Sequence, residues 1–376
     1  MNRDLLSRRL QQQGHTVSLA ENGRRALEMI AAEEFDLVLL DIMMPELDGY
    51  AVLERMRGDG TLDRLPVIMI SAVTELESVV RCIEMGATDY LPKPFNTVLL
   101  RARVGATLEK KRLRDRERLW ARSLERELEI GREIQQSFLP EELPQPAGWE
   151  IAATFRPARQ VAGDFYDAFP LAGGSRIGLV VADVCDKGVG AALFMALFRS
   201  LLRAFTERAF AAGDAAADGP RLLSTVVSTN DYIARTHGRS NMFATAFVAV
   251  LDPKTGSLAW VNAGHEAPVV SGPSRSPAAR LAPTGPALGM MPDMTFAARE
   301  AVLAPGETLF AFTDGVTDAR DPSGRLFSEE RLLELLSDGA PLAATLLASV
   351  ERAVDSHSAG SEPSDDITML AVRRAL

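Results

Sequence analysis

The sequence predicts an α/β domain with a parallel sheet at the N-terminus, then a long exposed helix, then a mixed α+β domain. Three observations support this division. Helical and strand-like patterns alternate over the first hundred residues, as in sheets with crossover helices. Residues 105–136 contain nine Lys or Arg and seven Asp or Glu but no proline, which is typical of a solvated helix. Beyond Leu139 and Pro140, alternating strand-like segments are separated by glycine and proline turns.

In the first domain, Leu5, Leu6 and Leu10 mark one face of a helix that ends at Gly14. Residues 35–41 form an apolar run that ends in an aspartate, which is typical of a strand buried on both faces. The other segments predict strands at 16–20, 66–71 and 89–91, and helices at 23–32, 50–57 and 75–85. We therefore expect a parallel sheet within residues 1–104.

The linker over residues 105–137 carries a second pattern. Apolar or small residues recur at spacings of three and four, which indicates a helical seam and a short parallel coiled coil. They are Trp120, Leu124, Leu128, Gly131, Ile134 and Phe138. The basic cluster at 110–118 is interleaved with acids and contains no aromatic residue, so it favours a solvated helix over a nucleic-acid patch.

In residues 138–376, strands are predicted at 176–182, 243–251, 257–262, 308–313 and 367–372, and helices at 191–211, 222–237 and 329–336. The order is not a strict alternation, so a mixed domain is favoured over a second parallel sheet. Residues 211–220 and 271–286 are rich in Ala, Gly and Pro and predict surface loops. The apolar stretch 191–205 is broken by Arg199 and Arg203, which favours a buried helix over a bilayer span.

Composition excludes several classes of protein. The net charge of −10 argues against a chain built to coat nucleic acid or an anionic membrane. Two cysteines are too few for a disulfide framework, and the four histidines lack the spacing of zinc ligands. The N-terminal residues have no apolar core of a signal peptide, so we expect a cytoplasmic protein without nucleic-acid or membrane partners. Any metal site must be built from carboxylates.

Three polar residues follow strands of the predicted parallel sheet. Asp41, Ser71 and Lys93 each end a strand, and ligands bind at the carboxyl edge of such sheets. A carboxylate, a hydroxyl and an ammonium on one rim suit a phosphorylated aspartate, whereas Asp41 alone could equally be a helix cap.

The motifs around these residues resemble the receiver domain of two-component response regulators. They are DIMMP at 41–45, DG at 48–49, SA at 71–72 and KPF at 93–95. The resemblance implies a flavodoxin-like fold in which Asp41 accepts phosphate from a histidine kinase. Ser71 would be the switch hydroxyl, Tyr90 the switch aromatic residue, and Lys93 the phosphate contact. A cis peptide bond is expected before Pro94.

One feature departs from the receiver pattern. Receivers open with a central strand ending in two acidic residues that bind Mg²⁺, and residue 1 here already falls at the start of the first helix. The hypothesis is a shortened receiver or a start site assigned too far downstream. Mg²⁺ would support phosphorylation of Asp41 if that acidic pair exists.

The second half places aspartates after apolar runs and beside glycines. Asp164, Asp183 and Asp314 stand near glycines in this way, and Asp365 leads into the last predicted strand. Each alone is most often a turn residue. Four carboxylates gathered in one domain would repel one another unless cations lay between them. Oxygen-only ligands favour Mg²⁺ or Mn²⁺.

The order of these motifs resembles the RsbU/SpoIIE branch of the type 2C (PPM) metal-dependent serine/threonine phosphatases. The motifs are IQQSFLP at 134–140, GDFYD at 163–167, AD at 182–183 with KG at 187–188, NAGH at 262–265, TDGV at 313–316 and DDIT at 365–368. The resemblance implies a β-sandwich flanked by helices. It also implies two ions of Mn²⁺ or Mg²⁺ held by the catalytic residues Asp164, Asp183, Asp314 and Asp365 together with the Val184 carbonyl, with Asp366 next in line.

The implied chemistry is hydrolysis by two metal ions, in which a bridging water attacks phosphorus in line. Arg159 is the first choice for phosphate capture, ahead of Arg156 and Lys187. His265 is either an acid or a structural turn residue. The interpretation is a response regulator, dimeric through its linker, that dephosphorylates an anti-sigma-factor antagonist in a partner-switching pathway. The rival hypothesis is a signalling adaptor that sequesters a partner without turnover.

Overall fold

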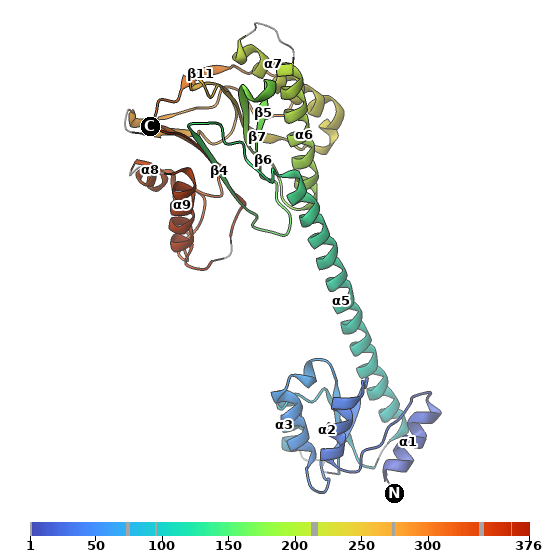
Figure 1. Cartoon of the computed structure of the whole chain (residues 1–376). Helices are drawn as coiled ribbons and strands as arrows, with labels where there is room; N and C mark the ends of the chain where they lie inside the picture. The colour runs from blue at the N-terminus through green and yellow to red at the C-terminus, as the bar shows by residue number, and fades with distance from the viewer. Residues whose placement is uncertain are drawn as a thin grey trace. The chain divides into compact units, whose positions relative to one another are not determined.

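The computed structural model describes residues 2–72, 76–94, 96–211, 217–272, 275–337, 342–361 and 363–376. The chain divides into two compact units, Met1–Glu125 and Arg126–Leu376. Figure 1 shows the chain in full, with helix α5 (Thr97–Phe138) running without a break from the first unit into the second. The predicted linker helix is therefore confirmed, and it begins earlier than residue 105.

The first unit is an α/β domain, as predicted. Its sheet contains three parallel strands in the order β1-β2-β3, and apolar residues pack on both faces of that sheet. The strands are β1 (Val38–Asp41), β2 (Val67–Ser71) and β3 (Asp89–Pro92), and the helices are α1 (Asn2–Gln12), α2 (Gly23–Ala32), α3 (Gly49–Gly58), α4 (Leu76–Glu84) and the start of α5, with a 3-10 turn at η1 (Thr61–Asp63). The α4 prediction began at Glu75, which lies outside the described residues.

The predicted strand at 16–20 is wrong. The segment does not pair with any strand in the described part of the unit, and β1 pairs only with β2. In a flavodoxin-like sheet the strand at this position pairs with a central strand, and no described strand lies beside β1 on that side. A segment with an apolar pattern forms a strand only when a neighbouring strand is present to hydrogen-bond with it.

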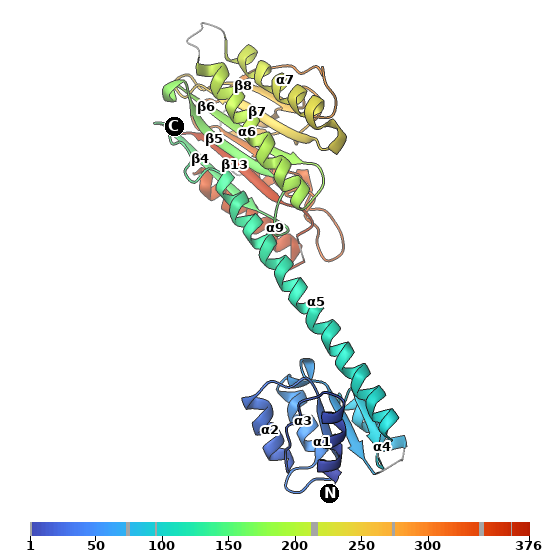
Figure 2. The ribbon, with the colours of Figure 1, turned by 90° about the vertical axis from the view of Figure 1, so that its right-hand side faces the viewer.

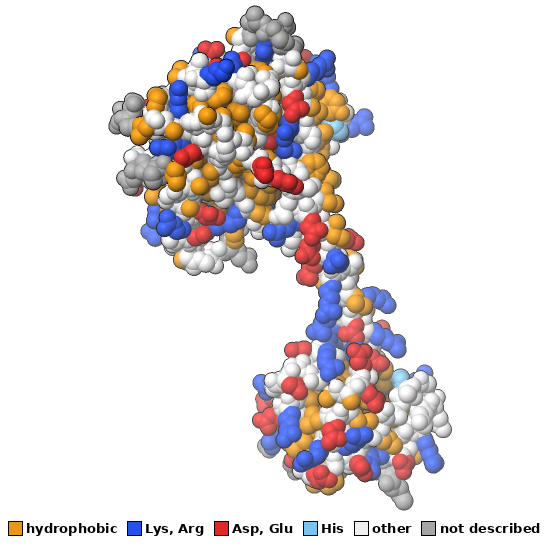
Figure 3. Space-filling view, viewed as in Figure 1, with side chains coloured by type: hydrophobic (Ala, Val, Ile, Leu, Met, Phe, Trp, Pro, Cys, Tyr) orange, Lys and Arg blue, Asp and Glu red, His pale blue; other side chains and the backbone are white. Residues whose placement is uncertain are grey.

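Helix α5 is exposed along its middle turns and carries charges of both signs. Figure 3 shows basic and acidic side chains next to each other along it, and Lys111 pairs with Asp115 one turn later at 2.5 Å. The predicted seam does not form one buried face. Trp120, Leu124 and Ile134 are exposed, whereas Gly131 is half-buried against the second unit's own residues.

The second unit is a sandwich of two five-stranded antiparallel sheets. The strand orders are β10-β9-β12-β13-β4 and β11-β8-β7-β6-β5, and the inner faces pack against each other through residues such as Val181, Phe247 and Leu370. Helices α6 and α7 cover the outer face of the β5–β8 sheet, and α8 and α9 cover the outer face of the other (Figures 1 and 2).

The strands of this unit are β4 (Trp149–Arg156), β5 (Phe165–Leu171), β6 (Arg176–Val184), β7 (Ala244–Leu251), β8 (Ser257–Ala263), β9 (Val269–Gly272), β10 (Arg275–Arg280), β11 (Arg299–Val302), β12 (Thr308–Phe312) and β13 (Ile367–Arg374). The helices are α6 (Val189–Ala211), α7 (Asp218–His237), α8 (Glu329–Ser337) and α9 (Ala343–Ser358), with 3-10 turns η2 (Ala172–Gly174) and η3 (Gly238–Ser240). The predicted mixed α+β class is confirmed.

Two predicted loops are partly wrong. The segment 271–286 contains β10, and α7 begins at Asp218, inside the predicted loop 211–220. Residues 212–216 and 273–274 lie outside the described residues. The sequence signal failed at β10 because its six residues, RSPAAR, contain a proline and two arginines in place of alternating apolar residues.

Helix α6 is long and apolar enough to span a membrane by length and composition. It packs instead as a core helix, with Ala191, Met195, Phe198 and Leu202 buried against the β5–β8 sheet and α7. Its Arg199 forms an ion pair at 2.9 Å with Asp167 of β5, whose side chain is 0% exposed. The arginine that breaks the apolar stretch therefore fastens the helix to the sheet.

We expect Arg199→Met to lower the free energy of unfolding of this unit by about 2 kcal/mol. Removing one partner of a buried pair typically costs roughly 3–5 kcal/mol. The cost is smaller here because Arg203 remains 3.5 Å from the Asp167 carboxylate, and burial already raises the pKa of Asp167. Urea unfolding is the measurement, with Arg208→Met, an exposed arginine of the same helix, as the control. Equal midpoints for the two variants would contradict the role of the pair.

Candidate functional site

Four strand ends meet at one end of the sandwich and carry the predicted aspartates. Asp164 directly precedes β5, and Asp183 is the penultimate residue of β6, its antiparallel neighbour. Asp314 follows β12 and Asp365 precedes β13, the corresponding pair in the other sheet. Antiparallel neighbours bring the end of one strand beside the start of the next. The topology therefore gathers residues that are up to 201 positions apart in the chain, from Asp164 to Asp365.

Asp164 and Asp183 are in contact at the buried side of this cluster. Asp164 is 2% exposed, and its Oδ2 accepts a hydrogen bond of 2.7 Å from the Thr313 hydroxyl of the other sheet. Burial and the neighbouring Asp183 raise the pKa of Asp164 well above its usual value. Burial and the charge of Asp314 raise the pKa of Asp183 to about 7, although a hydrogen bond with Asp164 acts to lower it. The two carboxyl groups therefore share a site that is short of positive charge.

Asp314 and Asp365 form the more exposed side of the cluster. Burial first, and then the charge of Asp365, raise the pKa of Asp314 to about 6. The Lys187 ammonium lies 2.8 Å from Asp365 Oδ2 and also donates to the Ser364 carbonyl at 2.8 Å. Lys187 thus neutralises one carboxylate of a cluster that otherwise repels itself.

Asp366 has a different position from its neighbour. Its Oδ1 accepts the Ala158 N–H at 2.7 Å and its Oδ2 accepts the Gly163 N–H at 2.9 Å. Both carboxylate oxygens therefore hold the loop between β4 and β5. Asp365, one residue earlier, points to Lys187 instead.

The donor set fits a hard divalent cation. It offers carboxylate oxygens and the Val184 carbonyl, which are the ligands that Mg²⁺ and Mn²⁺ take. Gly163 lies so close to that carbonyl that a Cβ would come within 2.7 Å of its oxygen. In the described residues, no three His, Cys, Asp or Glu side chains already stand together as a ligand group.

The residues predicted to bind phosphate or to act as an acid lie in different environments. Arg159 is exposed on the loop that Asp366 holds, whereas Arg156 points to α9, where it pairs with Asp355 at 2.6 Å. His265 is buried beside Thr245, at 2.8 Å, and burial lowers its pKa to about 4. This burial and the hydrogen bond to Thr245 favour a structural role for His265 over that of an acid.

Sequence reasoning missed the hydroxyl of Thr313 as a partner of Asp164. The signal was present, because Thr313 directly precedes Asp314 at the end of an apolar strand. It also missed the role of the buried Gln135, although this residue lies within the IQQSFLP motif at 134–140.

The first unit gathers the other predicted site. The Lys93 ammonium pairs with Asp41 Oδ2, and the Met43 N–H donates to Asp41 Oδ1 at 3.2 Å. Ser71 is fully buried and forms a hydrogen bond with Tyr90, whose pKa burial raises. The peptide bond before Pro94 is cis, as expected, and Phe95 lies outside the described residues.

The turn after Asp41 is held close to its strand by a glycine. A Cβ on Gly49 would lie 2.3 Å from the Asp41 carbonyl oxygen, so α3 begins against the end of β1. Asp48 caps this helix by accepting the Ala51 N–H at 2.8 Å. The helix cap, which was the alternative role for Asp41, is therefore supplied by Asp48. Asp41 pairs with Lys93 instead.

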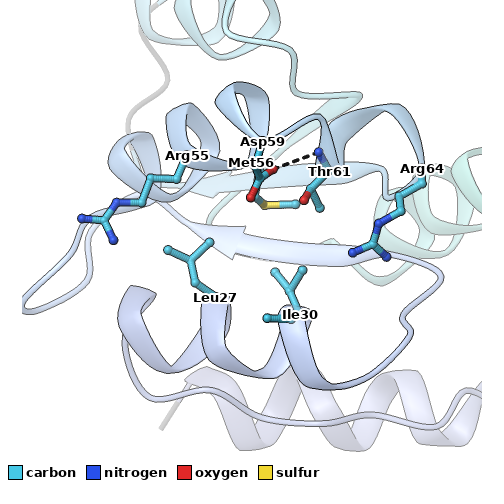
Figure 4. Close-up of a pocket in the computed structure, with 8 residues that line it drawn as sticks. Leu27, Ile30, Arg55, Met56, Asp59, Thr61 and Arg64 are labelled. Carbon is cyan, nitrogen blue, oxygen red and sulfur yellow. Dashed lines mark hydrogen bonds between the residues drawn. The ribbon is translucent and has the colours of Figure 1, made fainter.

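A small cavity lies between α2 and α3, apart from Asp41. Figure 4 shows its apolar lining of Leu27 and Ile30 from α2 and Met56 from α3, with Arg55 and Arg64 at opposite ends of the cavity. Asp59 is occupied in a turn, because it accepts the Thr61 N–H at 2.9 Å. These residues do not converge on a ligand position.

Two protein-family models match the chain. The response regulator receiver domain matches residues 1–105, and Stage II sporulation protein E (SpoIIE) matches residues 173–375. The second match covers more than half of the chain, so the chain belongs to the SpoIIE family, with a receiver domain before it. Both resemblances noted in the sequence are confirmed.

Individual relatives agree with this division. Protein IcfG of Synechocystis sp. is 47% identical over 265 residues, which are 66% of this chain and 41% of IcfG. The response regulator MprA of Mycobacterium ulcerans is 44% identical over 115 residues, which are 31% of this chain and 49% of MprA. The chain thus spans less than half the length of each of these relatives. The solved PP2C domain of SiaA from Pseudomonas aeruginosa has a TM-score of 0.57 at 21% identity, over 67% of this chain and 98% of that domain. This likeness establishes the fold of the second unit.

Proposed function

We propose that the chain is a response regulator whose output is a metal-dependent phosphatase acting on phosphoserine or phosphothreonine in proteins. The observation that carries the proposal is the gathering of Asp164, Asp183, Asp314 and Asp365 at one end of a type 2C fold. Their shared burial and mutual repulsion, which raise the pKa values of Asp164, Asp183 and Asp314, create a strong demand for cations. In a cluster that only stabilised the fold, this repulsion would lower stability without any compensating function.

The residues of this chain have distinct roles in the proposal. Asp164, Asp183, Asp314, Asp365 and the Val184 carbonyl hold two ions, Mn²⁺ or Mg²⁺. Bound ions of this kind supply an activated water and neutralise the phosphoryl oxygens. Thr313 orients Asp164, and Asp366 holds the loop that carries Arg159.

Arg159 is proposed to bind the substrate phosphate. Its loop is fixed on both sides, at Ala158 and Gly163, and its side chain is exposed. A guanidinium in this position matches the geometry of a phosphate group. Lys187 would leave Asp365 when a cation replaces it there.

The first unit supplies the input. A histidine kinase would phosphorylate Asp41, and Ser71, Tyr90 and Lys93 would read the phosphoryl group. The proposed boundaries are 1–104 for the receiver, 105–137 for the linker and 138–376 for the phosphatase. The proposed substrate is a phosphorylated anti-sigma-factor antagonist, in the cytoplasm.

The phosphatase proposal is tested with a phosphoserine protein, the full chain and Mn²⁺. We expect release of inorganic phosphate, and a rate that changes when acetyl phosphate is added. The change should vanish in Asp41→Asn, because the asparagine side chain cannot accept phosphate. Release of phosphate that is unaffected by acetyl phosphate would contradict the receiver input, and no release at all would contradict the phosphatase.

We also propose a homodimer formed through α5. Trp120 is 74% exposed and Leu124 48% exposed on a helix whose own unit does not cover them. Because residues four apart lie on one helical face, the pair forms an apolar strip that a second copy would bury. Trp120→Glu is expected to weaken dimerisation at least tenfold in analytical ultracentrifugation, and Arg122→Ala, two residues away on another face, to leave it unchanged. A monomeric wild-type protein at tens of micromolar would contradict the dimer.

A further inference from the structure

One buried side chain of α5 is bonded to the loop that leads into the site. Gln135 is 5% exposed although its neighbours Ile134 and Gln136 face solvent. Its Nε2 donates to the Ala162 carbonyl at 2.7 Å, and its Oε1 accepts the Ala162 N–H at 2.9 Å. The amide therefore satisfies both backbone groups of one residue, as a neighbouring β-strand would.

The position of Ala162 gives this contact its importance. Asp164 lies two residues further on, and Arg159 lies three residues before it in the same loop. Asp366 holds the loop at Ala158 and at Gly163. Gln135 binds the loop at Ala162, between those two points.

The same face of α5 packs on the loop one turn earlier. A Cβ on Gly131 would lie 3.6 Å from Val161 Cγ1, and residues 131 and 135 share a helical face. Leu139, one turn later, is buried in the apolar cluster under α6 and α7. The last turns of α5 are thus part of the second unit's structure, and Gln135 is their only described hydrogen-bond contact with residues 157–163.

We propose that Gln135 is a positioning residue for the metal site, acting through Ala162 on Asp164 and on Arg159. It does not contact substrate or cation. The inference rests on the proposed function, because it assigns to Asp164 the role of a ligand. Without the amide, the Ala162 N–H and carbonyl lose their partners in a buried place, and the loop must shift to hydrate them. The ligand Asp164 would then no longer be held in place.

The test uses the full chain and two variants of the residue. Gln135→Leu removes both hydrogen bonds, and Gln135→Glu keeps the acceptor while losing the donor. Gln136→Leu is the matched control, because it changes the adjacent glutamine, which is exposed. The readouts are Mn²⁺ affinity by isothermal titration calorimetry and hydrogen exchange of the 157–164 segment in the metal-free protein.

We expect Gln135→Leu to weaken Mn²⁺ binding about tenfold, which corresponds to about 1.4 kcal/mol of binding free energy. We also expect it to speed hydrogen exchange of the 157–164 segment. Gln135→Glu should fall between Gln135→Leu and the wild type, and Gln136→Leu should match the wild type. Wild-type Mn²⁺ affinity in Gln135→Leu overturns the inference. If Gln135→Leu does not fold, wild-type affinity in Gln135→Glu overturns it equally.

Failure of the proposed function has a different signature. A wild-type chain that binds no Mn²⁺ would remove the ligand role of Asp164, and with it both proposals. Faster exchange of the segment in Gln135→Leu would still show that the amide holds the loop. A wild-type chain that binds Mn²⁺ while Gln135→Leu binds it equally well would leave the phosphatase proposal standing and remove the role of Gln135.

Discussion

Replacing Asp183 or Asp314 by alanine is expected to lower kcat/KM for a small aryl phosphate by at least about 1,000-fold in the presence of Mn²⁺. Bound cations contribute several kcal/mol of charge stabilisation in the transition state, and about 1.4 kcal/mol corresponds to a factor of ten. Each substitution removes a carboxylate from the most strongly interacting part of the cluster. Asp355→Ala, which changes an exposed acid of the same unit, is the control and should keep wild-type activity.

The same variants should behave differently in the metal-free protein. The pKa of Asp183 is raised from 3.8 to about 7 and that of Asp314 from 3.8 to about 6. The folded state therefore holds protons that the unfolded chain releases, and its stability falls as pH rises from about 4 to 7. We expect Asp314→Ala to melt at a higher temperature than the wild type at pH 7.5 without metal. A lower melting temperature would show that Asp314 supports the fold rather than the chemistry.

The second large effect is expected from Gly315→Ala. A Cβ at this position would lie 1.9 Å from the Asp366 carbonyl oxygen and 2.9 Å from its carbon. Both are backbone atoms, so the clash cannot be relieved by a side-chain rotation. The turn after β12 would have to separate from the turn before β13, and these turns carry Asp314 and Asp365.

We expect Gly315→Ala to lower the free energy of unfolding by about 3 kcal/mol, at the upper end of overpacking costs, and to lower activity at least about 100-fold. Urea unfolding and aryl phosphate hydrolysis measure the two effects. Gly219→Ala is the control, because its Cβ would meet the nearest atom at an ordinary 3.6 Å. A Gly315→Ala protein with wild-type activity would show that the two turns need not be so close.

The sequence was informative about the fold wherever an element had a clear period. The buried strand β2 and the amphipathic helix α2 were predicted almost to their ends because their apolar residues follow one pattern. The prediction at 16–20 failed because a strand depends on a partner that local sequence does not describe. β5 was missed since its seven residues, FYDAFPL, include Asp167 and Pro170, whose places are set by α6 and the sheet edge.

The candidate site was predictable to the level of motifs but not of contacts. Asp164, Asp183, Asp314 and Asp365 are visible because each follows or precedes an apolar strand. The distinction between Asp365 and Asp366 was not visible, because it depends on which carboxylate meets the N–H groups of Ala158 and Gly163. The role of Gln135 was hidden for the same reason, since its partner lies 27 residues later in the chain.

The central claim is that the aspartate cluster hydrolyses phosphate esters through bound cations. The most direct measurement is the hydrolysis of 4-nitrophenyl phosphate by metal-stripped full-length protein as Mn²⁺ is added. We predict background rates in excess chelator, activity that rises and saturates with Mn²⁺, and no such rise in Asp183→Ala or Asp314→Ala. Equal rates with and without chelator, or equal rates in the wild type and both variants, would contradict the claim.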